Sequence, residues 1–319
     1  MRSEQPCVAG PTLDDLQRRA VVMVLEHGAA NAAHRGATSE VIGARLELLD
    51  PRSRVSRTET RRKIVSALAE LCWYLRGTNA ADPITFWVPR YRAEVEDNGI
   101  VHGGYGPRLL GEGPEAQLSR VIQMLSDEGT HSTRRAVVQL FDRRDIAAPV
   151  RFKDVPCTCT MQFLRRPDGL HLVVSMRSSD ALVGLTHDVF CFTMLQEIVA
   201  NELGVDLGTY VHLAGSLHIY DENRADAQTF LDEGWQSTTD PMPSMPSGAQ
   251  WPHIAELLGC EERLREGRSY AELELPGDPY WADLVRVLAL HVARVKRPDE
   301  PEAQRIVNDL QHPVFSEFV

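Results

Sequence analysis

Apolar residues recur at intervals of three to four in some segments and cluster or alternate in others, so the chain is expected to contain both helices and strands. Helices are predicted from residue 13 to about residue 34, and at 64–75, 118–125 and 189–203. Thr12 and Asp188 precede the first and last of these and are side chains suited to capping a helix. Gly77 and Gly204 follow two of the helices and are expected to end them.

Short apolar runs bounded by turn residues predict strands at 41–49, 136–140, 158–164, 170–176 and 209–217. Residues 165–169 carry a hairpin signal between two of these strands. Residues 1–11 are expected to be a loose tail, and residues 78–113 to be rich in loops. Strands in the middle of the chain with helices before and between them, and no clean linker, predict one α+β domain over residues 1–319.

Net charge, the length of apolar runs and the cysteine spacing limit which classes of protein this chain can belong to. The 319 residues carry a net charge of −11, which argues against nonspecific nucleic-acid binding as the main role. No apolar run is long enough for a membrane span, and the first residues lack a signal core, so we expect a cytoplasmic protein. The six cysteines do not form a metal-ligand spacing. Reduced thiols and no bound metal are therefore expected.

A reactive cysteine is the first candidate for chemistry. Cys157 stands at the head of a predicted strand, and arginine charge can lower a thiol pKa from about 8.5 to roughly 3.5–7.5. Arg134, Arg135 and Arg177 are the candidate helpers. Taken alone, a small buried apolar side chain is the more common role of cysteine. Cys159 would face the same side of the strand and is an alternative nucleophile.

Anion-binding and proton-handling side chains surround this cysteine in the sequence. Arginine makes forked, charge-assisted bonds to phosphate, although arginines on a surface are usually just solvated. Glu70 is a carboxylate inside an apolar helix, which suits a group that exchanges protons with a substrate, or it simply faces outward. His218 and Tyr220 alternate on one face of a strand, as binding groups or as satisfied core residues.

Taken together and in order, these residues resemble those of the thymidylate synthase family. The resemblance rests on matching motifs over about residues 30–225: Glu70–Asn79, Tyr105-Gly106, Arg134-Arg135, Pro156-Cys157, Gln162-Phe163, Arg177–Asp180, Gly184-Leu185, and His218–Tyr220 with Asn223. It implies an α+β fold with a large mixed β-sheet and surrounding helices. It also implies a homodimer whose interface is one face of that sheet.

The resemblance also implies roles for single residues. Cys157 would add to carbon 6 of a pyrimidine nucleotide, and carbon 5 would then attack 5,10-methylenetetrahydrofolate. Glu70 and Tyr105 would manage protons through ordered water. The phosphate would be bound by Arg35, Arg177, Ser178, Ser179 and, across the dimer interface, the partner's copies of Arg134 and Arg135. The sugar would contact His218 and Tyr220, and the folate would be bordered by Trp87, Asp180, His187 and Val319.

One departure from the family concerns the base. The residue that contacts the base is asparagine in thymidylate synthase and Asp188 in this chain. Cytosine offers an amine donor and an acceptor nitrogen, which a carboxylic acid matches. An ionised carboxylate facing uracil would leave polar groups unpaired at about 1–3 kcal/mol each. Aspartate here is similar to the CMP and dCMP 5-hydroxymethylases, in which water captures the one-carbon unit and tetrahydrofolate is released. The alternatives to a hydroxymethylase are a thymidylate synthase and an inactive nucleotide-binding relative.

Two further departures lie beside the predicted site. Thr158 stands where a histidine usually follows the nucleophile, and His187 stands where phenylalanine usually precedes the base-contacting residue. We hypothesise that His187 and Asp154 make the folate side more polar and help to hold water near carbon 5.

Overall fold

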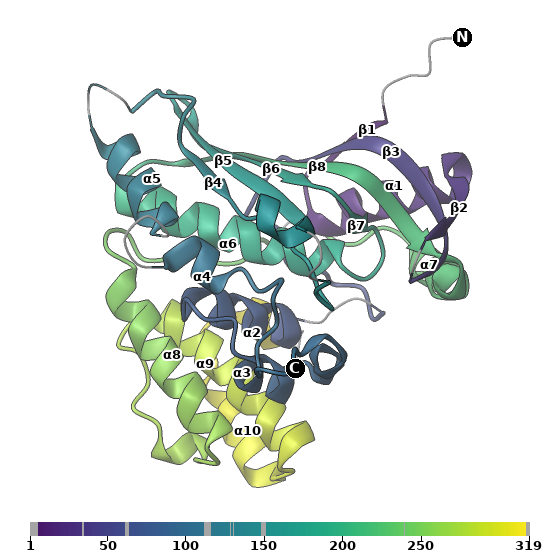
Figure 1. Cartoon of the computed structure of the whole chain (residues 1–319). Coiled ribbons are helices and arrows are strands. Elements are labelled where there is room, and N and C mark those ends of the chain that lie inside the picture. The colour runs from purple at the N-terminus through teal and green to yellow at the C-terminus, as the bar shows by residue number, and fades with distance from the viewer. Residues whose placement is uncertain are drawn as a thin grey trace.

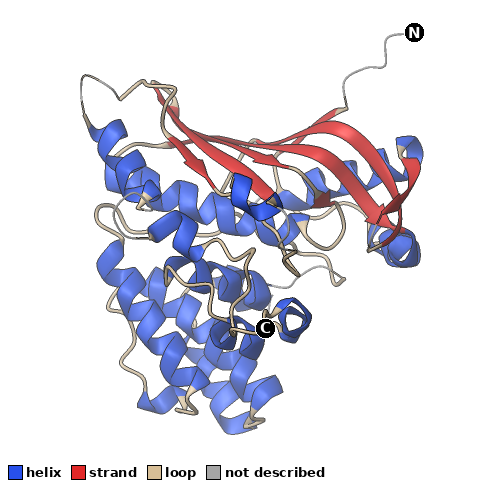
Figure 2. Cartoon of the chain, viewed as in Figure 1, coloured by secondary structure: helices blue, strands red, loops and turns tan. Residues whose placement is uncertain are grey.

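The computed structural model describes residues 6–33, 35–60, 64–111, 116–127, 129, 131–147, 151–238 and 240–316. A twisted sheet forms one layer, helices cover one of its faces, and a second group of helices lies beyond them (Figures 1 and 2). The strands are β1 (Cys7–Gly10), β2 (Ala29–Ala33), β3 (Gly36–Leu48), β4 (Val137–Gln139), β5 (Thr158–Arg166), β6 (Gly169–Met176), β7 (Ser179–Asp180) and β8 (Leu207–Tyr220).

The helices frame this sheet. The α-helices are α1 (Leu13–His27), α2 (Ile64–Leu75), α3 (Ala81–Trp87), α4 (Gly106–Leu110), α5 (Gln117–Ser126), α6 (Leu185–Leu203), α7 (Arg224–Asp232), α8 (Trp251–Arg265), α9 (Pro279–His291), α10 (Glu300–Asp309) and α11 (Pro313–Ser316). The short helical turns are η1 (Pro89–Glu94), η3 (Arg143–Ile146), η4 (Asp221–Asn223), η5 (Tyr270–Glu272) and η6 (Val292–Lys296).

The sheet is mixed, with strand order β1-β3-β8-β6-β5-β4, while β2 pairs with β3 and β7 pairs with β8. β3 and β8 form a long antiparallel ladder, and β6 lies parallel to β8 on its other side. The end of β8 therefore lies beside the short strand β7, with Asp180 opposite His218. This pairing brings residues that are far apart in the sequence to one edge of the site.

Helix α6 is the central helix of the fold. Nearly all of its side chains are buried because it lies under the sheet and packs against α2 on its other side (Figure 1). The carboxylate of Glu197 on this helix is 1% exposed and pairs with the fully buried guanidinium of Arg54. A buried charge is tolerated here because an opposite charge accompanies it. None of the helices in the described ranges combines the length and apolar character that crossing a membrane requires.

Most predicted elements are confirmed. The predicted helices correspond to α1, α2, α5 and α6, and the predicted strands to β3, β4, β5, β6 and β8. Gly77 and Gly204 follow their helices with φ of 65° and 62°, a left-handed conformation that glycine adopts without steric cost. The α+β class with a large mixed sheet and surrounding helices is likewise confirmed.

Four local predictions were wrong. The first helix was expected to run to about residue 34, but α1 ends at His27 and the strand β2 (Ala29–Ala33) follows and pairs with β3. The segment expected to be a loose tail includes β1, which pairs in parallel with β3 and so gains backbone hydrogen bonds that a pattern search over four residues does not reveal. The segment 78–113 contains α3, η1 and α4. Asp188 does not cap α6, because the helix begins one turn earlier at Leu185 and Gly184 occupies the N-cap position.

Candidate active site

A cavity of about 630 Å³ lies between the end of the sheet, α2 and the start of α6. Its volume is in the range of small-molecule sites. It brings together most of the residues predicted from the sequence: Arg35, Glu70, Tyr105, Cys157, Arg177, Ser178, Ser179, Asp180, His187, Asp188, His218 and Tyr220. The structure thus places these residues around one cavity, and their chemical roles remain predictions.

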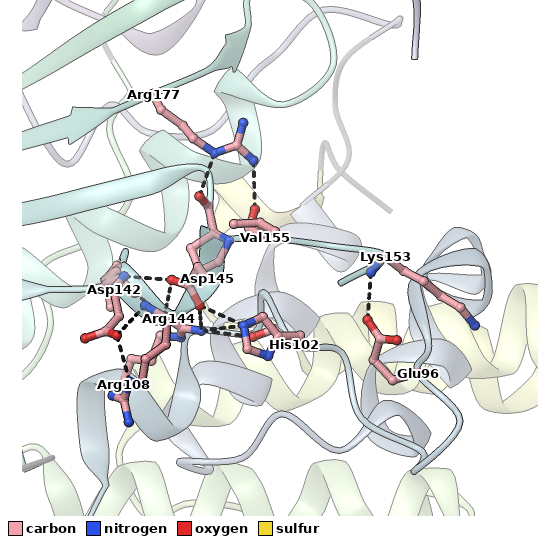
Figure 3. A network of polar contacts seen from close by, with 11 residues as sticks. Glu96, His102, Arg108, Asp142, Arg144, Asp145, Lys153, Val155 and Arg177 are labelled. Atoms are coloured by element: carbon pink, nitrogen blue, oxygen red, sulfur yellow. Dashed lines mark hydrogen bonds and ion pairs between the residues drawn. The ribbon is translucent and has the colours of Figure 1, made fainter. Parts of the chain in front are cut away.

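Cys157 stands immediately before β5 and is held there by Arg177. The Arg177 Nε donates to the Pro156 carbonyl at 2.9 Å and Nη2 donates to the Val155 carbonyl at 2.9 Å (Figure 3). The same Nη2 is 3.6 Å from the Cys157 Sγ. One arginine therefore both shapes the segment before the cysteine and contacts its sulfur.

The expectation of a lowered thiol pKa was wrong for the ligand-free site. Burial raises the pKa of Cys157 to about 11, with further upward contributions from Asp188 and Asp154, against the opposing charges of Arg177 and Arg35. The arginine is close, but desolvation of a thiolate in a largely buried position outweighs it. Cys157 is therefore a protonated thiol until a substrate changes its surroundings.

Tyr105 lies on a loop whose position depends on a buried ion-pair network. The carboxylate of Asp145 accepts from Arg108 at 2.7 and 2.8 Å and contacts the ring of His102 at 2.7 Å (Figure 3). Arg108 also donates to the Leu140 carbonyl, so the loop is tied to the end of β4. A Cβ on Gly104 would lie 2.8 Å from the Asn79 Cβ, so the close packing of this loop requires glycine.

Glu70 projects from α2 and is 3% exposed. Its Oε1 accepts from the Tyr91 hydroxyl at 3.2 Å and lies 3.4 Å from Arg90 Nη2. Neither Arg90 nor Tyr91 was identified as a site residue, because the segment was expected to be a loop. The proline at the first position of η1, Pro89, is a signal for a helical turn that would have placed them on one short element.

Asp188 faces the cavity from the first turn of α6. Burial, reinforced by the carboxylates of Glu70 and Asp180, raises the pKa of Asp188 well above its ordinary value, against the opposing charge of Arg90. Within the part of the chain that the structure describes, no group hydrogen-bonds its carboxyl. Desolvation therefore favours the protonated form of Asp188, in which the carboxyl would offer one donor and one acceptor to a ligand, as in the carboxylic acid of the sequence argument.

The predicted anion binders are partly engaged with other groups. The Arg35 Nη2 is 2.9 Å from Glu94 and 3.9 Å from Asp154, two carboxylates that sequence reasoning had not assigned to the anion site. The Ser179 hydroxyl is 2% exposed and lies 3.1 Å from the His212 Nε2, beneath the cavity. An anion bound in the cavity must therefore compete with Glu94 for Arg35, and both Ser178 and Ser179 line the cavity.

Three predicted site residues do not line this cavity. Arg134 and Arg135 are exposed just before β4, outside the cavity of their own chain. Trp87 is 5% exposed and donates its indole N–H to Glu261 of α8 at 2.6 Å. It lines a neighbouring cavity of about 240 Å³ instead. The predicted contact of Val319 falls outside the described residues.

His187 lies between the two cavities and lines both. Its Nε2 is 2.7 Å from the Ser66 hydroxyl and its Nδ1 is 3.2 Å from the Val183 carbonyl. A carbonyl can only accept, so the Nδ1 carries the proton in this contact. On the same wall, Asp180 accepts from the backbone N–H groups of Leu182 and Val183 at 2.8 and 3.0 Å.

His218 and Tyr220 project side by side from β8, with ring centroids 5.2 Å apart in an edge-to-face arrangement. Their alternation on one strand face is as predicted. Among the described residues, no group of three or more His, Cys, Asp or Glu side chains is arranged to hold a metal ion. The cavity thus presents a thiol together with several carboxyl, phenol and guanidinium groups to whatever it binds.

Comparisons with known proteins agree with this geometry. The chain is 32% identical over 157 residues to a deoxyuridylate hydroxymethyltransferase of Pseudomonas phage M6, covering 49% of this chain and 44% of the relative. It is 30% identical over 206 residues to a deoxyuridylate hydroxymethyltransferase of Delftia phage PhiW-14, covering 60% of this chain and 56% of the relative. The chain thus spans about half the length of these relatives. The sequence profile of thymidylate synthase matches residues 18–247, and the chain belongs to the thymidylate synthase family.

Proposed function

We propose that this protein is a cytidine 5′-monophosphate 5-hydroxymethylase that acts on CMP or dCMP. The co-substrate, 5,10-methylenetetrahydrofolate, supplies the one-carbon unit, and water completes the hydroxymethyl group as tetrahydrofolate is released. The wall formed by Asp180, Val183 and His187 fits the folate, because it is polar and adjoins a second cavity that extends the first. The observation that carries the choice of base is the position of Asp188 on the cavity wall, where desolvation raises the pKa of its carboxyl and favours the protonated form.

A protonated carboxyl group can form a hydrogen bond with each of the two cytosine groups that distinguish this base. Its carbonyl oxygen accepts from the exocyclic amine, and its hydroxyl donates to ring nitrogen 3. Because nitrogen 3 of cytosine is a much better base than the 4-oxygen of uracil, the carboxyl group donates a stronger hydrogen bond to cytosine than to uracil. Asp188 is therefore expected to favour cytosine over uracil. This preference is expected to be smaller than that of an ionised carboxylate, which would also repel the wrong base.

Asp188 would also assist the attack of Cys157. As the sulfur bonds to carbon 6, the electron pair of the carbon 5–carbon 6 double bond moves toward carbon 5 and nitrogen 3. A proton donated to nitrogen 3 stabilises that charge, as preorganised donors do in other enzymes. The Cys157 proton must leave at the same time, since the pKa of this thiol is about 11 in the ligand-free site. Glu70, at the same cavity, is the carboxylate available to accept a proton.

Arg35, Arg177 and Ser178 are proposed to bind the 5′-phosphate, and His218 with Tyr220 the sugar. Arg134 and Arg135 are exposed and outside their own cavity, which supports the proposal that they complete the phosphate site of a partner subunit. A single domain and a homodimer formed through the open face of the sheet belong to the same proposal.

His187 is the basis for proposing that the product carries a hydroxymethyl group rather than a methyl group. This side chain is 5% exposed and brings a polar ring and the Ser66 hydroxyl to a wall where phenylalanine is expected in a thymidylate synthase. A polar wall holds water near the one-carbon unit better than an apolar one. His187→Phe should raise the fraction of methyl product, and an unchanged product ratio would rule out this role.

A deoxyuridylate hydroxymethylase is the second candidate. A neutral Asp188 can also donate to the 4-oxygen of uracil and accept from its ring nitrogen 3. The names of both phage relatives favour this substrate. A thymidylate synthase that makes dTMP from dUMP is the third candidate.

Single-substrate incubations distinguish these candidates. CMP, dCMP, UMP and dUMP are each supplied with methylenetetrahydrofolate, and products are identified by mass, with Cys157→Ser as the control for nonenzymatic reaction. Hydroxymethyl product from a cytidine nucleotide without dihydrofolate supports the proposal and names the sugar. Hydroxymethyl product from dUMP alone favours the second candidate, and methyl product with dihydrofolate favours the third. Nucleotide binding without any turnover would mean that the protein is an inactive relative.

A further inference from the structure

The phenol of Tyr105 accepts two hydrogen bonds from one residue. The backbone N–H of Thr158 donates to the Tyr105 oxygen at 3.2 Å, and the Thr158 hydroxyl lies 3.0 Å from the same oxygen. Thr158 is fully buried, and Tyr105 is 7% exposed on the cavity wall. The residue next to the nucleophile therefore holds the phenol from behind, at the position where the family resemblance would place a histidine.

The direction of the hydroxyl–hydroxyl bond follows from counting protons. If the Thr158 hydroxyl donates, its proton is satisfied and the Tyr105 proton is left to point into the cavity. If Tyr105 donated instead, the buried Thr158 proton would need another acceptor, and among the described residues none contacts it. Buried donors are rarely left unpaired, so the first arrangement is favoured. The Tyr105 oxygen then has both of its lone pairs occupied.

Glu70, the other group predicted to handle protons, is arranged to accept hydrogen bonds rather than to donate them. Glu70 receives the Tyr91 hydroxyl and the Arg90 guanidinium, both of which can only donate to a carboxylate. Both donors lie on Oε1, so Oε2 is left to accept from water or substrate. Burial, the nearby Cys157 and Asp188 raise the pKa of Tyr105 well above its ordinary value, so this phenol keeps its proton throughout the neutral range.

We infer that Thr158 is a positioning residue that commits Tyr105 to donating its proton into the cavity beside Cys157, so that Glu70 is the group that accepts protons there. The catalytic part of this inference deepens the proposed function and rests on it. The orientation of the Tyr105 hydroxyl, by contrast, is a property of the ligand-free protein. Tyr105 and Cys157 line the same cavity, so the proton that Tyr105 does not give to Thr158 is directed into the space that also holds the thiol.

The experiment is a double-mutant cycle. Thr158→Val removes the hydroxyl at nearly constant volume, and Thr158→Ser is the matched control that keeps it. Each is made in the wild-type protein and in the Tyr105→Phe background. The first measurement is the rate of alkylation of Cys157 between pH 7 and 10, by peptide mass in the nucleotide-free protein. The second is kcat and KM with whichever of the four nucleotides is turned over.

Thr158→Val should slow Cys157 alkylation and lower kcat by roughly tenfold, with KM within about twofold, because a donor to a developing charge is misaligned. Thr158→Ser should restore both to within about threefold, and in the Tyr105→Phe background the valine substitution should change neither by more than about twofold. Equal losses in both backgrounds, or a serine variant as slow as the valine variant, would overturn the inference. Failure of the proposed function would leave the alkylation result standing, and thermal unfolding midpoints report folding separately.

Discussion

A buried carboxylate in the C-terminal helices allows a stability prediction whose magnitude follows from the structure. Glu261 of α8 is 1% exposed and accepts from the Trp87 indole at 2.6 Å, from Arg76 at 2.5 Å and from Arg265 at 2.7 Å. Helix α8 lies beyond the segment that matches the family profile, whereas Arg76 and Trp87 lie within it. Glu261 thus joins the C-terminal helices to the residue that follows α2 and to the end of α3, which lines the neighbouring cavity.

Glu261→Ala removes the negative partner of two arginines and of one indole N–H. Breaking a buried ion pair by deleting one partner costs about 3–5 kcal/mol. The lower end applies to the ion pairs, because the side chains of Arg76 and Arg265 are each 17% exposed and can reach water. The unpaired indole N–H adds about 1 kcal/mol, so we expect a loss of about 3–5 kcal/mol in the free energy of unfolding.

The neighbouring residue is a matched control. Glu262 contacts the same arginine, at 3.3 Å, but its side chain is 50% exposed. Surface ion pairs contribute about 0–1 kcal/mol, so Glu262→Ala should be nearly silent. Both variants are compared with the wild type by urea unfolding at pH 7. A Glu261→Ala variant within about 1 kcal/mol of the Glu262→Ala variant would mean that burial does not strengthen this cluster, and would refute the reasoning.

Three further outcomes are expected. Asp188→Asn should lower the preference for cytidylate over uridylate, measured as a ratio of kcat/KM, by about tenfold, because an amide N–H is a weaker donor to nitrogen 3 than a carboxyl O–H, by about 1.4 kcal/mol; an unchanged ratio would place the base elsewhere. Alkylation of Cys157, whose pKa is about 11, should accelerate about tenfold per pH unit from pH 7 to 10, whereas a plateau below pH 9 would contradict the burial argument. Burial alone would raise the pKa of Glu197, but Arg54 and Arg52 hold it below its ordinary value. Glu197→Gln should therefore be less stable than the wild type at pH 7, by a margin that narrows below about pH 4; a margin independent of pH would be the contrary result.

The site was largely predictable because its residues lie in short motifs. Cys157, Glu70 and Asp188 come from a strand end and two helices that apolar spacing alone located within a few residues, and the family resemblance then related them to one another. Arg90 and Tyr91 were missed because their short helix carries no apolar period. The role of Glu94 was missed for another reason, since an ion pair with Arg35 joins segments 59 residues apart.

The sequence by itself determined the class of fold, the main helices and strands, and the set of side chains available for chemistry, because apolar spacing and turn residues act locally. The tertiary structure alone decided how those side chains behave. Burial raises the pKa of Asp188 and leaves Cys157 protonated, and neither effect is visible in residues considered one at a time. The tertiary structure also determines that β1 pairs with β3 and that the Trp87 indole donates to Glu261. Desolvation and long-range pairing depend on what surrounds a group in space, which the order of residues along the chain does not express.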